Sequence, residues 1–221
     1  MPNWTENTLK IRGNYENLRK FEADMALAIT KYCCPIVDNA QVFTFNLARP
    51  MPEALIDTVS PRKKTREDIL TFAKSQNWSE ADIQASLQYA ATDEEAKRSE
   101  ELKSLYGHDN WYDWRMQNWG VKWDAVRCTS KELSDFNTLV YTFDSPWGTP
   151  EHFVRQLSSL YPDATFEMVS GSIENDTHYE FTCCDGNFEE TCSYETFKEA
   201  VVDGKWGGWN EWAEMFQEDE E

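Results

Sequence analysis

The hydrophobic period of the chain changes at Gly13, and this change restricts the folds that the chain can adopt. Leu9 and Ile11 alternate with polar neighbours, which predicts a half-buried strand that stops at the glycine. From about residue 14 to 32, large apolar residues instead recur three or four positions apart until Pro35, which predicts an amphipathic helix. Because a strand that leads into a helix is the first half of a βαβ unit, we expect a sheet covered by helices.

Later segments repeat these two periods. Strand patterns occupy residues 41–46, 123–129, 138–143, 165–169 and 179–184. Gly171 and the polar residues 174–177 separate the last two strands, which indicates a hairpin. Thr149 precedes Pro150 and an apolar helical stripe, which predicts a helix capped by Thr149. Residues 194–217 have a helical pattern interrupted by glycines.

Residues 61–106 differ in composition from the rest, since they are strongly charged and contain few large apolar groups. Helix starts at Ser79-x-x-Asp82 and Thr92-x-x-Glu95 predict two or three solvated helices inserted into the sheet domain, and a lid or partner-binding role stays open. We therefore predict an α+β protein: a ferredoxin-like split βαβ sandwich with a helical insertion and an acidic C-terminal strand and helix extension. The predicted parts are 1–60 (first half of the ferredoxin-like domain), 61–106 (insertion), 107–185 (a Trp-rich helix and the second half) and 186–221 (acidic extension).

The negative charge is concentrated at the C-terminal end. The chain has a formal charge of -19, and residues 163–221 contribute -15 of it, with seventeen acidic residues against Lys198 and Lys205. Such a surface repels nucleic acid and anionic membranes and attracts basic protein surfaces. Solubility alone is the alternative explanation of the charge.

Four of the ten tryptophans lie close together, at Trp111, Trp114, Trp119 and Trp123. If Asp109 caps a helix that ends at Gly120, the aromatic residues of this segment lie on two sides of it, which favours a place in the core over a binding site. We expect Trp119 and Trp123 to be largely buried.

The sequence gives little support for catalysis. The three histidines have no metal-binding spacing, and neither a phosphate-binding glycine loop nor a nucleophile elbow follows a strand. His178-x-Glu180 matches part of a zinc deaminase signature, but the downstream Pro-Cys-x-x-Cys is missing. The six cysteines include two adjacent pairs instead of Cys-x-x-Cys, which favours buried free thiols. No enzyme activity, catalytic residue, cofactor or metal is therefore expected.

Several motifs carry a family resemblance. They are Met1-Pro2-Asn3-Trp4, Asn110-Trp-Tyr-Asp-Trp-Arg, Asn118-Trp-Gly-x-Lys-Trp-Asp124 and Ser145-Pro146-Trp147. On these motifs the chain resembles the YubB-like, Api-type ferredoxin-fold family carried by plasmids and phages, over residues 1–185. The resemblance implies a ferredoxin-like fold and a mobile-element setting, and it brings no catalytic residues.

Charge and setting together predict an inhibitor of a host nucleic-acid-binding defence complex, of the anti-CRISPR or anti-restriction kind, which acts as a DNA mimic on a basic groove. The predicted partner-binding residues are Glu189, Glu190, Glu195, Glu199, Asp203, Glu211, Glu214 and Glu218. The alternative is a nucleic-acid-binding accessory protein that uses exposed aromatics on a ferredoxin-like sheet. Direct nucleic-acid binding is not expected, since the only basic cluster, residues 62–66, adjoins acidic residues.

The N-terminal sequence predicts where the protein acts. Met1-Pro2-Asn3-Trp4 is not a basic stretch followed by an apolar run, and no window approaches eighteen apolar residues. We therefore expect neither a signal peptide nor a membrane span, and we expect the protein in the host cytoplasm.

Overall fold

The computed structural model describes residues 3–33, 41–132, 137–192, 194–206 and 216. The chain divides into two compact units, one made of residues 1–50 and 118–221 and the other of residues 51–117. The first unit contains the sheet and the second is helical. Among the described residues, none of the helices combines the length and the apolar character needed to cross a bilayer.

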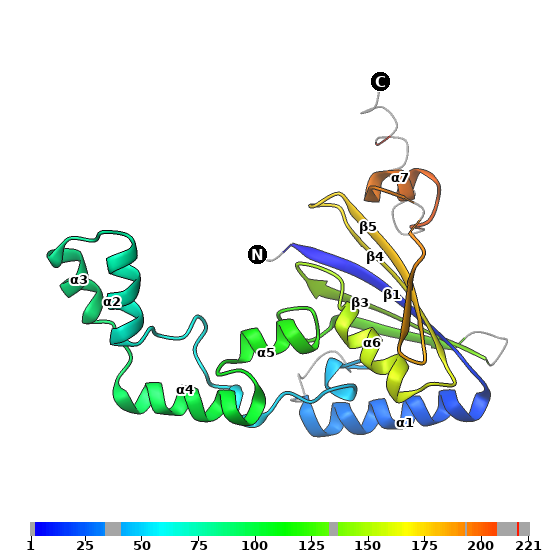
Figure 1. Ribbon diagram of the computed structural model, residues 1–221. Coiled ribbons are helices and arrows are strands. Elements are labelled where there is room, and N and C mark those ends of the chain that lie inside the picture. Colours follow the sequence, from blue (N-terminus) through cyan, green and yellow to red (C-terminus); the bar gives the residue numbers. More distant parts are fainter. Residues whose placement is uncertain (1–2, 34–40, 133–136, 193, 207–215, 217–221) are drawn as a thin grey trace. The chain divides into compact units, whose positions relative to one another are not determined.

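The first unit contains a six-stranded antiparallel sheet (Figure 1). Its strands are β1 (Trp4–Arg12), β2 (Val126–Glu132), β3 (Thr138–Pro146), β4 (Thr165–Ser172), β5 (Thr177–Cys184) and β6 (Asn187–Glu190). They lie in the order β2-β3-β1-β4-β5-β6, so the first strand pairs with both β3 and β4. The predicted α+β class and the β4–β5 hairpin are confirmed.

Two helices cover one face of the sheet, α1 (Tyr15–Tyr32) and α6 (Glu151–Leu160) (Figure 1). The period-two pattern turns Leu9 and Ile11 toward this face, where both side chains are fully buried. Phe21 on α1 lies 6.3 Å from Phe166 on β4, measured between ring centroids. Asn14 caps α1 by accepting a hydrogen bond from the backbone N–H of Asn17, so the predicted change of period at Gly13 is confirmed.

The segment predicted as a strand at residues 41–46 is not a strand. Thr44 caps a short 3-10 helix, η1 (Phe45–Leu47), and its backbone enters no sheet. Phe43 and Phe45 are both fully buried, with ring centroids 4.7 Å from Phe143 and Phe153 respectively. The alternating apolar pattern reflects burial of two rings in the helical layer, while the backbone polar groups find partners other than a neighbouring strand.

Asp124 binds one of these backbone groups and two side chains of the same segment. Its carboxylate accepts hydrogen bonds from the Thr44 hydroxyl (2.6 Å), the Phe45 backbone N–H (2.7 Å) and the Asn46 side-chain amide (3.0 Å). A carboxylate that accepts several such bonds is a strong local clamp, because each bond to a charged group stabilises by about 1.5–3 kcal/mol. Asp124 therefore fixes the segment that carries the two buried phenylalanines.

Trp119 fastens the same region a few residues along. Its indole N–H donates to the carbonyl of Arg49 at 3.0 Å, and its ring lies 5.8 Å from that of Phe45. Gly120 follows with a φ of 85°, a left-handed conformation that glycine adopts without strain. The Trp-Gly-x-Lys-Trp-Asp motif therefore has a structural role, since its first and last residues bind the segment from Thr44 to Arg49.

The tryptophan predictions are confirmed only in part. Trp119 is 1% exposed and Trp114 is 3% exposed, so both are core residues. Trp123 is less completely buried than these two, with its ring 6.5 Å from that of Trp4. The cap of the helix that carries Trp111 and Trp114 also differs from the prediction. The Asn110 side chain, not that of Asp109, accepts a hydrogen bond from the backbone N–H of Asp113 at 2.9 Å.

Other boundaries also differ from prediction. The strand expected at residues 123–129 begins later, at Val126, because Asp124 and Ala125 belong to the clamp. Pro150, without a side-chain cap, precedes α6, whereas Thr149 was the predicted cap. Strand β6 lies in the predicted strand and helix extension, but no strand pattern marked its residues, since they include one large apolar side chain, Phe188.

The second unit contains η2 (Glu53–Leu55), α2 (Arg66–Ser75), α3 (Glu80–Leu87), α4 (Asp93–Tyr106) and all but the last residue of α5 (Trp111–Asn118). Capping boxes start α2 and α4, the latter at the predicted Thr92 and Glu95.

Asp109, which follows α4, is a buried carboxylate of this unit. Burial alone would raise the pKa of Asp109, but hydrogen bonds from Ser99 and Asn110 and the charge of Lys103 outweigh it and lower the pKa.

We predict that Asp124→Ala lowers the free energy of unfolding by about 2–4 kcal/mol, because it removes an acceptor shared by several donors that stay partly buried. Urea denaturation followed by circular dichroism measures this change. Asp163→Ala, at an exposed position, is the control and should change stability by less than about 0.5 kcal/mol. Equal effects of the two substitutions would contradict the role of Asp124.

Candidate functional site

A small terminal cap packs on the sheet face opposite α1 and α6 (Figure 1). We define the terminal cap as residues 194–206 and Phe216, which include the short helix α7 (Phe197–Val202). Its buried apolar side chains are Phe197, Ala200, Val201, Trp206 and Phe216, and half-buried Val169 and Ile173 of the β4–β5 region pack against them. The cap therefore has an apolar cluster of its own, separate from the layer under α1.

Gly171 of β4 provides the space in which the terminal cap sits. A Cβ atom at this position would lie 2.5 Å from Phe197 and 2.7 Å from Trp206, closer than any van der Waals contact allows. The register places Gly171 opposite His178 of β5 on the same face. The absence of a side chain at residue 171 is therefore what lets the two aromatic rings approach the sheet.

Helix α7 has a well-defined start. Thr196 and Glu199 form a capping box, and the Asp176 carboxylate accepts the backbone N–H of Lys198 at 3.1 Å. The second interaction ties the start of the helix to the β4–β5 hairpin. Glu199, one of the predicted partner-binding residues, thus has a structural role as well as an exposed position.

A chain of polar contacts, buried except at Lys205, lies beneath the terminal cap. The Trp206 indole N–H donates to Nδ1 of His178 at 3.1 Å, and Nε2 of His178 lies 2.8 Å from the Glu180 carboxylate. Lys205 donates to the other oxygen of Glu180 at 2.8 Å. The His178 side chain is fully buried. Burial alone would raise the pKa of Glu180, but the hydrogen bonds from Lys205 and His178 outweigh it, so that the pKa is lowered and the carboxylate is ionised at neutral pH.

The His178-x-Glu180 fragment therefore acquires an interpretation that the sequence did not suggest. Alternate residues of a strand face the same side, so the two side chains meet under the terminal cap. No nucleophile contacts the imidazole among the described residues, and no three His, Cys, Asp or Glu side chains there gather into a possible metal site. The contacts link the cap to the sheet.

The predicted acidic residues divide by location. Glu189 and Glu190 lie exposed on the edge strand β6, and Glu195, Glu199 and Asp203 lie exposed on the terminal cap. None of these five forms an ion pair with another described residue, whereas Lys205 of the cap is neutralised by Glu180. Glu211, Glu214 and Glu218 lie outside the described residues. Successive residues of a strand face opposite sides, so Glu189, paired with Thr182, points to the sheet face that carries the terminal cap, whereas Glu190, paired with Phe181, points to the face that α6 covers. We refer to the five exposed carboxylates together as the acidic surface, which includes both sides of this sheet edge.

The rest of the sheet face beside the terminal cap is polar. It carries the Arg12–Glu167 ion pair and the hydrogen-bonded hydroxyls of Thr129 and Thr142. On the described strands, Trp4 is the aromatic ring on the part of this face that the cap leaves uncovered. Trp123, which precedes β2, lies with its ring 6.5 Å from that of Trp4, whereas single-strand binding typically uses several successive stacking platforms along a sheet.

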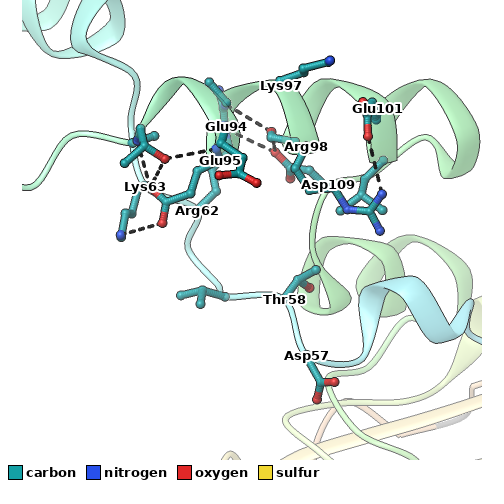
Figure 2. A pocket seen from close by; sticks show the side chains of 16 residues that line it. Asp57, Thr58, Arg62, Lys63, Glu94, Glu95, Lys97, Arg98, Glu101 and Asp109 are labelled. Carbon is teal, nitrogen blue, oxygen red and sulfur yellow. Dashed lines mark hydrogen bonds and ion pairs between the residues drawn. The ribbon is translucent and has the colours of Figure 1, made fainter.

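The second unit contains a groove of about 570 Å³ between residues 57–63 and α4 (Figure 2). Three of its cations are engaged within the unit: Arg62 by Asp68 and Asp109, Lys63 by Glu95, and Arg98 by Glu101. Two members of the basic cluster at residues 62–66 are thus part of ion pairs that hold this unit together. An anionic ligand in this groove would have to compete with these carboxylates for the three cations.

The cysteines have different environments. Burial raises the pKa of the Cys183 thiol to about 11 and, with the charges of Asp124 and Asp144, that of Cys128 to about 12. Cys184, the neighbour of Cys183, is exposed, while Cys33 and Cys192 are half-buried and Cys34 lies outside the described residues. The expectation of buried free thiols is therefore correct for Cys183 and wrong for Cys184, which faces the other side of β5.

Comparisons with known proteins give little. No family model matches the chain, and a search of the curated proteins finds no match. Among solved structures, the chain is similar to the crystal structure of the protein api92 from Yersinia pseudotuberculosis, with 14% identity, a TM-score of 0.44, and coverage of 88% of this chain and 99% of that one. This likeness is compatible with the Api-type resemblance, but at such a TM-score it carries no argument.

We predict that Gly171→Ala undocks the terminal cap without unfolding the sheet. The methyl group would overlap Phe197 and Trp206, so hydrogen exchange of residues 197–203 should accelerate at least about tenfold while β3 stays protected. Gly148→Ala is the matched control, because nothing lies within 4 Å of its added Cβ. Unchanged exchange in Gly171→Ala would contradict the packing described for the cap.

We also predict that iodoacetamide at pH 8 modifies Cys184 at least about tenfold faster than Cys183 or Cys128, because a buried thiol with a raised pKa provides little thiolate. Peptide mass spectrometry over a time course measures the three rates. In denaturant the rates should become equal. Similar rates in the native protein would show that the sheet does not shield Cys183.

Proposed function

We propose that the protein binds a host protein complex through the acidic surface and blocks a basic groove that normally holds nucleic acid. The observation that carries this proposal is the set of five exposed carboxylates without ion-pair partners, held on β6 and the terminal cap. Unpaired charge on a folded scaffold attracts a cationic partner more strongly than charge already neutralised by neighbours. Host defence complexes of the CRISPR or restriction type are the proposed targets, which makes the protein a DNA mimic.

The arrangement of the sheet supports a scaffold of ferredoxin-like type. In the first unit β1, α1, β2, β3, α6 and β4 follow one another as in a split βαβ sandwich, and their sheet order is β2-β3-β1-β4. We propose that these elements are a ferredoxin-like domain, that β5, β6 and the terminal cap extend it, and that the chain belongs with the YubB-like, Api-type proteins of plasmids and phages. In that setting the protein would act in the host cytoplasm, where its target works.

The electrostatics favour a binding role of this kind. Carboxylates spread over an edge strand and a neighbouring cap present separate negative charges, as a phosphate backbone does, and a basic groove gains from each of them. Such attraction speeds association and weakens as salt is raised, since the Debye length falls from about 10 Å at 0.1 M salt to about 3 Å at 1 M. A salt-sensitive complex with a nucleic-acid-binding protein is therefore the expected behaviour.

The test compares two variants with equal changes of charge. The first carries Glu189→Gln, Glu190→Gln, Glu195→Gln and Asp203→Asn, and it leaves Glu199 in place because that residue caps α7. The matched control carries Glu53→Gln, Asp57→Asn, Glu94→Gln and Glu100→Gln, four exposed carboxylates of the second unit. Each protein is added to purified CRISPR effectors and restriction enzymes, and DNA binding is measured at about 150 mM salt.

We predict that the unmodified protein competes with DNA for at least one of these complexes, and that the first variant requires at least about tenfold more protein for half-inhibition, equivalent to about 1.4 kcal/mol. The control variant should stay within about twofold of the unmodified protein. Equal losses in both variants would reduce the effect to net charge and refute a specific surface. Binding of the chain itself to labelled single-stranded DNA would support the alternative function instead.

A further inference from the structure

We propose that His178 is a pH-sensitive latch, which holds the terminal cap on the sheet while its imidazole is neutral and releases the cap when the imidazole takes up a second proton. The inference goes beyond the proposed function and does not depend on it, because its first consequence is a change in how the cap packs. It rests on the contacts of His178, Trp206, Glu180 and Lys205.

The hydrogen bonds determine the tautomer of His178. An indole N–H can only donate, so Nδ1 of His178, 3.1 Å from Nε1 of Trp206, must be an unprotonated acceptor. The proton of the neutral ring is then on Nε2, where it is donated to the Glu180 carboxylate at 2.8 Å. Both ring nitrogens are fully used, and this pattern exists only for the neutral Nε2–H form.

The charged neighbours of His178 do not replace this pattern when a proton is added. Glu180 of β5 is the carboxylate in contact with the ring, and Lys205 already donates to its second oxygen. Tyr194, whose ring is 5.4 Å from the imidazole, has its hydroxyl near Asp203. On β4 the paired residue is Gly171, which has no side chain, and Cys192 contacts only the backbone carbonyl of His178.

A second proton would be placed on Nδ1, against the indole N–H. Two donors would then face each other in a site with no solvent access to the His178 side chain, so the Trp206 contact must break. Trp206 also packs against Phe197, with 5.3 Å between ring centroids, and both rings lie over Gly171. Displacement of Trp206 therefore loosens the apolar cluster that docks the whole cap.

The direction of the pH dependence follows from proton linkage. The docked cap holds His178 with one ring proton, whereas the undocked cap exposes the ring and lets it bind two. Since the undocked state binds more protons, docking weakens as pH falls. Glu195, Glu199 and Asp203 lie on the cap, so their placement beside β6 depends on pH as well.

The test is a pH titration by NMR together with hydrogen exchange. Imidazole nitrogen shifts report the tautomer of His178, which His178→Asn assigns among the three histidines. We predict the Nε2–H tautomer at pH 7.5, and a loss of protection of residues 197–203 by at least about tenfold between pH 7.5 and pH 5.5 after correction for intrinsic exchange. Protection of β3 should stay constant, which separates release of the cap from unfolding of the sheet.

Two variants remove the latch in different ways. In His178→Asn the amide oxygen can accept from Trp206 but does not titrate, and in Trp206→Phe the ring remains while the donor is gone. Both should show less than about twofold dependence of cap protection on pH over this range, whereas His108→Asn should behave as the unmodified protein. The proposal is overturned if the unmodified protein has the Nδ1–H tautomer at pH 7.5, or if His178 becomes doubly protonated while cap protection is unchanged.

Discussion

The clamp made by Asp124 determines how the two sequence-distant parts of the sheet unit come together. One carboxylate binds Thr44, Phe45 and Asn46, and Trp119 holds the carbonyl of Arg49 nearby. Residues 51–117 interrupt this unit between Pro50 and Asn118. These two residues are the immediate neighbours of Arg49 and Trp119, which the indole hydrogen bond joins. Because the ends of the interruption are fixed to each other, a helical segment can be inserted there without disturbing the sheet.

Local signals in the sequence were sufficient for much of the fold. The alternation of Leu9 and Ile11, the helix that follows Gly13 and the box at Thr92 and Glu95 depend on residues within a few turns or one strand, and all three are confirmed. The segment at residues 41–46 was misassigned because two buried rings two positions apart resemble a strand, while the carboxylate that fixes its backbone lies about eighty residues later. Strand β6 is polar and lies at an edge, where burial imposes little pattern.

For the site, composition located the acidic residues but did not distinguish their roles. Glu199 stabilises the start of α7 and Glu180 is buried beneath the terminal cap, whereas Glu189 and Glu195 are exposed and unpaired. The predicted strand began at residue 179, whereas β5 begins at Thr177, so that His178 and Glu180 face the same side of it. The third member of the contact, Trp206, lies about thirty residues later and packs against Gly171, where no side chain intervenes. No local pattern in the sequence reveals that these two residues meet.

The two faces of the sheet make different kinds of contact, and this difference explains why the terminal cap is suited to control. Under α1 and α6 aromatic contacts dominate, and the buried Asn7 bonds to the hydroxyls of Ser145 and Ser170, none of which changes its protonation between pH 5 and 8. Under the cap a small apolar cluster shares the interface with one histidine, one carboxylate and one ammonium group. Because the apolar cluster of the cap is small, the hydrogen bonds of His178 contribute a large share of the free energy that docks the cap. Docking of the cap can therefore respond to one proton while the sheet beneath it does not.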